Sequence, residues 1–154
     1  MPEIAPDFVY VTYIGASPDI VWNALIDRDL TRAYWDHYNV SDWKKGSRWE
    51  HVRTDAGGKV DLIGTVVEID PPRRLVITWG SPDAEEARRS KVVFEIAPVG
   101  AEAKLTVTHS ELEVGSEMLS GITRGWPQVL SNLKTLLETG KPLPTKPWAT
   151  AETA

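Results

Sequence analysis

The sequence predicts an α+β fold in which a curved antiparallel sheet holds one long helix across its concave face. Three observations support this fold: a strand-like segment and two short helical segments open the chain, period-two alternation follows between Gly46 and Leu112, and a wide apolar stripe ends at Gly140. The 154 residues, 42% of them hydrophobic, suffice for one domain with a single core. We expect this domain over residues 1–140 and a Pro-rich, partly disordered tail over residues 141–154.

The first elements are predicted to be a strand and two short helices. The segment Phe8–Ile14 alternates in side and is rich in β-branched and aromatic residues, which is typical of a strand. Ser17 precedes a proline and an acidic first turn, so a helix is predicted over residues 18–26. Asp29 is expected to cap a second short helix over residues 30–35.

Five further strands are predicted in the middle of the chain, because runs with period-two alternation are separated there by short turn signals. Turns this short join neighbouring strands only in the antiparallel direction. With the first strand they make a sheet of about six or seven strands. The expected runs are Arg48 to Arg53, Val60 to Ile69, Arg74 to Trp79, Lys91 to Ile96, and Lys104 to Leu112.

The last predicted element is a long amphipathic helix that ends at Gly140, a residue suited to a helix C-cap. Gly125 and Pro127 interrupt the pattern, and an interior proline loses one hydrogen bond. We therefore expect a kink near residues 124–127, or a helix that begins there. The apolar stripe consists of Met118, Leu119, Ile122, Trp126, Val129, Leu130, Leu133, Leu136 and Leu137.

Composition and charge exclude several function classes. The 17 Lys and Arg against 22 Asp and Glu give a net charge of −5 and form no basic cluster, which disfavours nucleic-acid binding. Without cysteine the chain forms no disulfide, no thiolate zinc site and no cysteine nucleophile. No basic start precedes an apolar run and no run of 18 apolar residues occurs, so we expect a cytoplasmic protein that does not insert into membranes.

Several short segments distributed over residues 8–140 carry a family resemblance. They are Ser17–Leu25, Tyr34–Trp35, Ser41–Ser47, Gly64–Leu75, Thr78–Trp79, Val93–Ile96, Leu105–His109 and Gly125–Pro127. Together they resemble the START-like (SRPBCC) superfamily, in particular its branch named after the activator of heat shock protein 90 ATPase. The resemblance implies a helix-grip fold, in which the sheet grips the C-terminal helix over a cavity.

Seven tryptophans in so small a domain predict either a bulky aromatic core or an aromatic-lined pocket. Trp22 is assigned to the core, and the alternation of its strand points Trp79 inward. With the cavity that the resemblance implies, we expect a small apolar or aromatic ligand between sheet and C-terminal helix, and no cofactor. The expected lining residues are Tyr34, Trp35, Trp49, Ile63, Val67, Trp79, Phe94, His109, Met118, Ile122 and Trp126.

His109 has two interpretations. It follows Leu105 and Val107 on one strand face, so it is expected to face the cavity and orient a polar ligand group, unless a neighbour satisfies its ring. An enzyme of the cyclase or hydrolase kind seen elsewhere in the superfamily is the alternative, with His109 and either Glu111 or Asp61 as acid and base. The spacing of the three histidines fits no zinc motif, so no metal site is expected.

Two kinds of protein partner stay open. The branch name implies a chaperone whose ATPase the chain would activate. The sheet edges and Trp148, an aromatic residue on the Pro-rich tail, favour a homodimer.

The residue Ala56 precedes two glycines between strand runs and no helix follows, so this segment is predicted to be a hairpin turn rather than a phosphate-binding loop.

Overall fold

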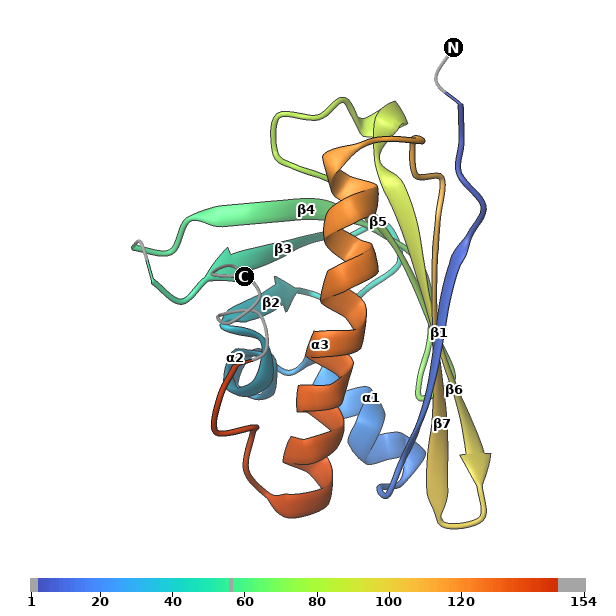
Figure 1. Cartoon of the computed structure of the whole chain (residues 1–154), viewed down its shortest axis with the longest axis vertical. Helices are drawn as coiled ribbons and strands as arrows, with labels where there is room; N and C mark the ends of the chain where they lie inside the picture. Colours follow the sequence, from blue (N-terminus) through green and yellow to red (C-terminus); the bar gives the residue numbers. More distant parts are fainter. Residues whose placement is uncertain (1–2, 56, 147–154) are drawn as a thin grey trace.

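The sheet is antiparallel throughout and curves around the interior of the molecule (Figure 1). The structure, a computed structural model, describes residues 3–55 and 57–146. In this part of the chain seven strands follow the order β1-β7-β6-β5-β4-β3-β2. The strands are β1 (Phe8–Ile14), β2 (His37–Ser41), β3 (Arg48–Arg53), β4 (Val60–Asp70), β5 (Arg74–Trp79), β6 (Ser90–Val99) and β7 (Glu102–Ser110). The predicted α+β helix-grip fold is therefore confirmed.

The helices α1 (Pro18–Ile26) and α2 (Arg28–Trp35) share one capping residue, Asp27. Its backbone N–H closes the last turn of α1, and its Oδ1 accepts a hydrogen bond from the backbone of Leu30 at 2.9 Å. The predicted cap at Asp29 is therefore wrong, because the carboxylate two residues earlier serves the end of one helix and the start of the next.

The long helix α3 (Glu117–Thr139) is continuous, with Ser116 as its N-cap and Gly140 as its C-cap. Pro127 lies inside it. The predicted start near residues 124–127 is wrong, because the buried apolar stripe continues on both sides of the proline and stabilises the helix beyond the one hydrogen bond that is lost. In Figure 1, α3 crosses in front of the sheet from the upper loop to the C-terminal segment.

Strand β2 was not predicted, since its segment was interpreted only as the polar exit of the second helix. It pairs antiparallel with β3, and His37 and Asn39 face the interior from it. A strand whose inward residues are polar shows no apolar alternation, so hydropathy could not reveal it. The remaining strands match the predicted ones, with ends displaced by up to three residues.

Strand β4 presents the opposite face from the predicted one. Leu62 lies opposite His51 in the register, so Leu62 and Gly64 face the interior. Ile63 and Val67 were expected to line a cavity but lie on the other face of the strand, where Ile63 is buried and Val67 is 41% exposed. The correction follows from a shift of one residue along the strand, because neighbouring side chains point to opposite faces.

Gly64 allows a close crossing between β3 and β5. Trp49 Nε1 donates a hydrogen bond to the carbonyl oxygen of Thr78 at 2.7 Å. A Cβ on Gly64 would lie 1.8 Å from that oxygen, so no larger residue fits without displacing a strand.

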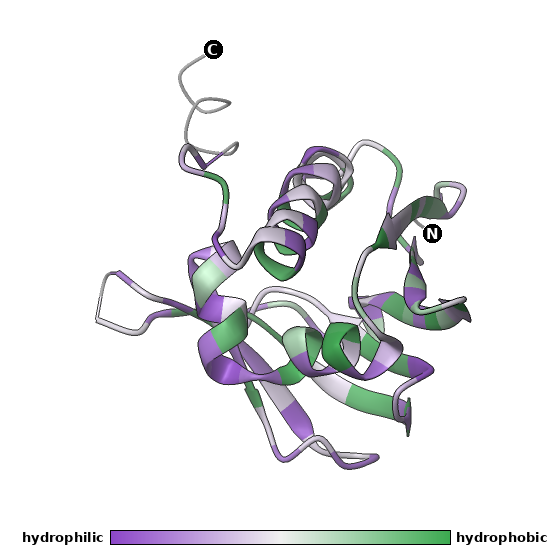
Figure 2. Cartoon of the chain, turned by 90° about the horizontal axis from the view of Figure 1, so that it is seen from below, coloured by the Kyte–Doolittle hydropathy of each residue, from purple (hydrophilic) through white to green (hydrophobic). Residues whose placement is uncertain are grey.

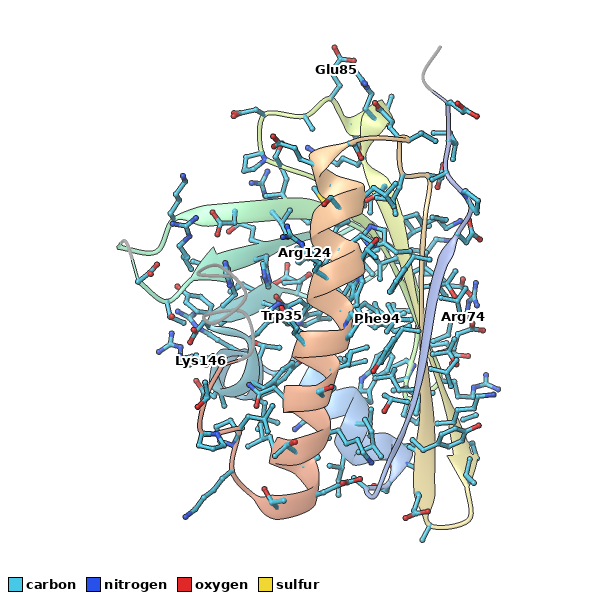
Figure 3. All side chains as sticks on the ribbon, viewed as in Figure 1. Trp35, Arg74, Glu85, Phe94, Arg124 and Lys146 are labelled. Carbon is cyan, nitrogen blue, oxygen red and sulfur yellow. The ribbon has the colours of Figure 1, made fainter. Side chains whose placement is uncertain are left out.

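The main core fills the space between the sheet, α1 and α3. Trp22 and Trp79 belong to it, as predicted. α1 contacts β6 and β7, while α3 contacts β1 and α2, so both helices cover the same face of the sheet (Figure 2). Figure 3 shows Trp35 on the α2 side of α3 and Phe94 on the β6 side.

The segment after α3 returns toward the domain. The backbone N–H of Leu143 donates to Asn132 Oδ1 at 2.6 Å, and Lys146 forms an ion pair with Asp36. Trp148, on which the homodimer hypothesis relied, lies outside the described residues. Among the described helices, none is long and apolar enough to cross a membrane.

Candidate functional site

A cavity of about 410 Å³ lies between α3, the end of α2 and strands β3, β4 and β5. We call it the α3 cavity. Its apolar wall consists of Trp35, Leu62, Trp79, Met118, Ile122, Trp126 and Val129. His37, His51, Asp61 and Glu117 supply polar groups, so the cavity combines a large aromatic surface with a small polar region.

Two glycines of α3 leave room for this cavity. Gly121 and Gly125 are one helical turn apart and both border it. A Cβ at either position would meet no atom within 4 Å. Glycine costs about 1 kcal/mol relative to alanine in a helix interior. The helix therefore carries two unfavourable residues at the positions where side chains would fill the cavity.

The tryptophan rings of the wall are in mutual contact. The ring centroid of Trp35 lies 6.3 Å from that of Trp79 and 5.6 Å from that of Trp126, and the last two are 5.3 Å apart. Offset and tilted ring contacts at these distances are favourable. The wall is therefore a packed aromatic surface against which a flat ring can lie.

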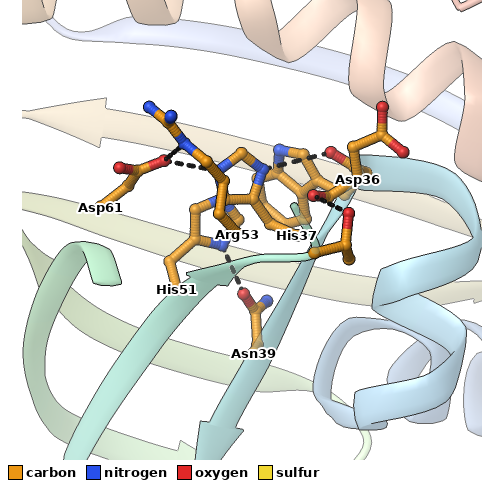
Figure 4. Close-up of polar contacts among 8 residues, drawn as sticks. Asp36, His37, Asn39, His51, Arg53 and Asp61 are labelled. Atoms are coloured by element: carbon orange, nitrogen blue, oxygen red, sulfur yellow. Dashed lines mark hydrogen bonds and ion pairs between the residues drawn. The ribbon is translucent and has the colours of Figure 1, made fainter. Parts of the chain in front are cut away.

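The polar region contains an ion-pair network on β2, β3 and β4 (Figure 4). Asp61 Oδ2 accepts hydrogen bonds from His37 Nε2 and from Arg53 Nε, both at 2.8 Å. Burial raises the pKa of Asp61, but the hydrogen bonds from His37 and Arg53 outweigh burial and hold that pKa below its ordinary value. Asp61 is therefore ionised at neutral pH, and its Oδ2 is shared between two donors.

His51 is buried beneath this network. Its ring stacks on that of His37 with centroids 4.2 Å apart and planes within 2°. Its Nδ1 bonds to Asn39 Oδ1 at 2.6 Å (Figure 4). Burial lowers the pKa of His51 well below its ordinary value, the nearby His37 lowers it further, and Asp61 opposes them. The ring is neutral at pH 7.

His109 lies on the other side of Trp79 and is fully enclosed. Trp126 Nε1 donates to its Nδ1 at 3.0 Å, which makes Nδ1 the acceptor. Its Nε2 then donates to Ser90 Oγ at 2.7 Å, and Ser90 Oγ donates to the carbonyl oxygen of Trp79 at 2.9 Å. Burial lowers the pKa of His109 to about 3. Both ring nitrogens are satisfied by neighbours, which agrees with the second of the two interpretations of His109, and His109 does not border the α3 cavity.

The expected lining residues divide into three groups. Those on the α3 cavity are Trp35, Trp79, Met118, Ile122 and Trp126. Buried in the core without bordering the cavity are Tyr34, Trp49, Phe94 and His109. Ile63 and Val67 face the opposite side of the sheet, as described above.

Four polar residues of the cavity wall were missing from the predicted lining: His37, His51, Asp61 and Glu117. Asp61 was named only as a candidate acid. The sequence also held a signal for His51, because His51 alternates with Trp49 and so shares its inward face. His37 could not be found in this way, since β2 has no apolar alternation. Among the residues that the structure describes, no three His, Asp or Glu side chains are arranged to hold a metal ion.

A second cavity of about 440 Å³ lies beyond Trp79, between the segment that includes η1 (Glu86–Arg88) and the loop before α3. Its rim is charged, and Arg88 forms an ion pair with Glu113 at 2.7 Å across it. Glu111, one of the two acids suggested as partners of His109, lies on this rim, and the ring nitrogens of His109 bond to Ser90 and Trp126 instead. The α3 cavity is therefore the better candidate for an apolar or aromatic ligand.

Trp79 also carries an unsatisfied donor. Its Nε1 is enclosed and has no hydrogen-bond partner among residues 3–55 and 57–146. Buried indole N–H groups usually find an acceptor. Trp79 borders both cavities, but its Nε1 atom is enclosed, so the free-energy cost of this unpaired donor stays within the protein interior.

Solved structures of other proteins share this fold. The chain is similar to the Aha1 dimer from Colwellia psychrerythraea, with 21% identity over 89% of this chain and 99% of that chain and a TM-score of 0.75. It is similar to MLL2253 from Mesorhizobium loti, with 25% identity, 86% and 97% coverage and a TM-score of 0.73. PFC0360w, an HSP90 activator from Plasmodium falciparum, matches with 24% identity, 90% and 99% coverage and a TM-score of 0.72.

A family model extends the likeness from fold to sequence. Among curated proteins, none matches the chain. The model described as Activator of Hsp90 ATPase homolog 1-like protein matches residues 15–138, which include every element from α1 to the penultimate residue of α3. The chain therefore belongs to the family of Activator of Hsp90 ATPase homolog 1-like proteins, a branch of the START-like (SRPBCC) superfamily.

Proposed function

We propose that the chain binds a small aromatic or apolar molecule in the α3 cavity. The observation that carries this proposal is a volume of about 410 Å³ with three tryptophans in its wall and two glycines of α3 on its border. Ligand pockets of roughly 300–1,000 Å³ are ordinary for small molecules. Burying a ring against this wall removes apolar surface from water and adds aromatic contacts.

The protein as purified and one probe test this proposal. Native mass spectrometry, followed by extraction, should reveal a retained aromatic or apolar compound at one per chain. The emptied protein should bind N-phenyl-1-naphthylamine saturably at one site, with enhanced fluorescence. If the protein retains no compound and also fails to bind the probe saturably, the proposal is contradicted.

An enzyme of the cyclase or hydrolase kind is a second candidate, and a specific observation favours it. His37 Nε2 and Asp61 Oδ2 are 2.8 Å apart on the wall of the α3 cavity, which is a histidine–carboxylate pair within hydrogen-bond reach. If the retained compound is a substrate, Asp61→Asn should slow its conversion at least about hundredfold while binding persists. Unchanged conversion would remove Asp61 from the reaction.

A chaperone partner is a third candidate. It is supported by the description of the family and by the name of the Plasmodium falciparum relative, an HSP90 activator. A pull-down with the 90-kDa heat shock protein and an ATPase assay would test it. Stimulation of the ATPase would favour this role, and no association would remove it.

We also infer that the chain forms a homodimer through the edge of its sheet. β1 is an edge strand, and Val9, Val11 and Tyr13 are exposed on one of its faces. A similar structure is that of a dimer. Sedimentation should give twice the monomer mass for the wild type and the monomer mass for Val11→Lys, because a charge on an edge strand opposes pairing. A monomeric wild type would contradict the inference.

A further inference from the structure

The orientation of His51 is fixed by a chain of hydrogen bonds that begins at α1. The carbonyl oxygen of Leu25 accepts a hydrogen bond from Asn39 Nδ2 at 3.5 Å. This contact turns the amide oxygen of Asn39 toward His51, where it lies 2.6 Å from Nδ1. An amide oxygen only accepts, so Nδ1 carries the proton of the neutral ring. Nε2 of His51 is therefore the nitrogen with a free lone pair.

This lone pair is open to the α3 cavity. Nε2 of His51 has no hydrogen-bond partner among the described residues. It is also absent from the unpartnered polar atoms that are fully enclosed there, so it is accessible. His51 is 3% exposed and borders the cavity, so the open side of the ring is the cavity side. A ligand that fills the cavity encloses this nitrogen, so a ligand without a donor would leave a buried acceptor unpaired, whereas a ligand donor would satisfy it.

The other polar groups of the wall lie in charged or solvated surroundings. Asp61 is held through Oδ2 in ion pairs with His37 and Arg53, while its Oδ1 has no partner among the described residues. Glu117 borders the cavity but is exposed at the start of α3, where water solvates it. Nε2 of His51 is the neutral acceptor of this wall, and the His51 ring lies among those of Trp35 and His37, whose centroids are 4.6 and 4.2 Å from its own.

We propose that His51 Nε2 accepts a hydrogen bond from a hydroxyl group on the ligand, so that the α3 cavity selects neutral hydroxylated aromatic molecules such as phenols. An ether or an unsubstituted ring leaves the acceptor unpaired, and an anion places negative charge against its lone pair. The inference rests on the proposed function and names its ligand class. Asn39 is the positioning residue, because it selects the tautomer.

Three naphthalene probes separate the contribution of ring burial from that of the hydrogen bond. Naphthalene, 2-methoxynaphthalene and 2-naphthol share one ring system, and only 2-naphthol donates a hydrogen bond. Calorimetric titration of the ligand-free wild type at pH 7 should show 2-naphthol binding at least about tenfold more tightly than 2-methoxynaphthalene. In His51→Phe the ratio should fall to about one, because the ring volume remains and the acceptor is gone.

A matched control is Leu62→Ala, which removes apolar contact from the same wall. It should weaken all three probes and leave the ratio unchanged. If His51→Phe does not fold, the ring nitrogens of the wild type give the answer by nuclear magnetic resonance. In the free protein, Nε2 of His51 should carry no proton, and its resonance should shift with 2-naphthol and stay in place with 2-methoxynaphthalene.

The outcomes distinguish this inference from the proposed function. If no probe binds, the proposed function fails and the inference fails with it. If all three bind with equal affinity, the cavity binds aromatic molecules and the inference alone is overturned. A preference for 2-naphthol that survives in His51→Phe would assign the acceptor to another group and would also overturn it.

Discussion

His109 and His51 are buried on two sides of the same tryptophan, yet they are bonded differently. Their ring centroids lie 5.5 and 5.9 Å from that of Trp79. His109 uses both ring nitrogens within the protein, whereas His51 uses only Nδ1 among the described residues. Burial alone therefore does not separate a structural histidine from an available one. The number of bonded ring nitrogens does.

The helix α3 creates this difference. Toward His109 it presents Trp126, whose indole N–H completes the hydrogen bonds of the ring. Toward His51 the helix has Gly121 and Gly125, which contribute no side chain. One region of the interior is closed by a large residue, and the other is held open by two small ones.

Removal of each histidine should give the largest contrast. His109→Ala should lower the free energy of unfolding by about 3–5 kcal/mol, because it opens a void in packed core, leaves the indole N–H of Trp126 unpaired and removes the donor to Ser90 Oγ. His51→Ala should cost less, since its ring already borders a cavity. Urea denaturation measures both, and equal costs would break the distinction between the two regions.

The pH dependence of stability should show the closed region directly. The pKa of His109 is about 3 in the folded chain, against an ordinary value of 6.5. Above pH 6.5 the ring is neutral in both states and adds no pH dependence. Below it the unfolded chain binds a proton that the folded chain does not, so the free energy of unfolding falls by roughly 3 kcal/mol on going to pH 4.

The matched variant for this titration is His109→Gln, which keeps His51 and every carboxylate. Unfolding of the wild type and of this variant should be compared at pH 7 and at pH 4. The wild type should lose more stability than the variant by the amount given above. Parallel losses would mean that His109 does not resist protonation in the folded chain.

Closing the α3 cavity should abolish binding without loss of stability. Gly125→Leu places a side chain in the open space and gains helix propensity, so the free energy of unfolding should rise by up to about 1 kcal/mol. Affinity for N-phenyl-1-naphthylamine should fall at least about tenfold. Ser120→Leu adds the same side chain at an exposed position of α3 and should leave the affinity unchanged. Equal affinities in all three proteins would place the probe elsewhere.

The smallest effect is expected at the polar network. Asp61→Asn should lower the free energy of unfolding by about 1 kcal/mol at pH 7, because the ion pairs with His37 and Arg53 are partly solvated. Since the pKa of Asp61 is held low in the folded chain, this contribution is present above its ordinary value of 3.8 and is lost as the pH falls through the lowered value. A difference in the free energy of unfolding between the wild type and Asp61→Asn that persists after Asp61 is protonated would contradict this role of the ion pairs.

Most of the fold could be predicted because its elements bury apolar faces with regular periods. β1, β3 and β5 have the predicted ends, since their apolar or aromatic residues alternate. β2 was not predicted because its inward residues, His37 and Asn39, are polar. The predicted inward face of β4 was wrong by one residue, because β4 has apolar residues at both odd and even positions and either set could face inward.

The site was predictable in its aromatic part and not in its polar part. Trp35, Trp79 and Trp126 were expected near the cavity and line it. The roles of the histidines depend on partners far away in the sequence: Trp126 and Ser90 for His109, and Asn39 for His51. A single sequence does not contain these pairings, because the register of the strands and the path of α3 bring them together.

His51 and His109 can be observed together in one experiment. The wild-type protein, labelled with ¹⁵N at histidine, is titrated with 2-naphthol and observed by nuclear magnetic resonance. The ring signals of His51 should shift and saturate at one molecule per chain, while those of His109 stay in place. Shifts at His109 with none at His51 would contradict the claim that the ligand occupies the open region of the interior.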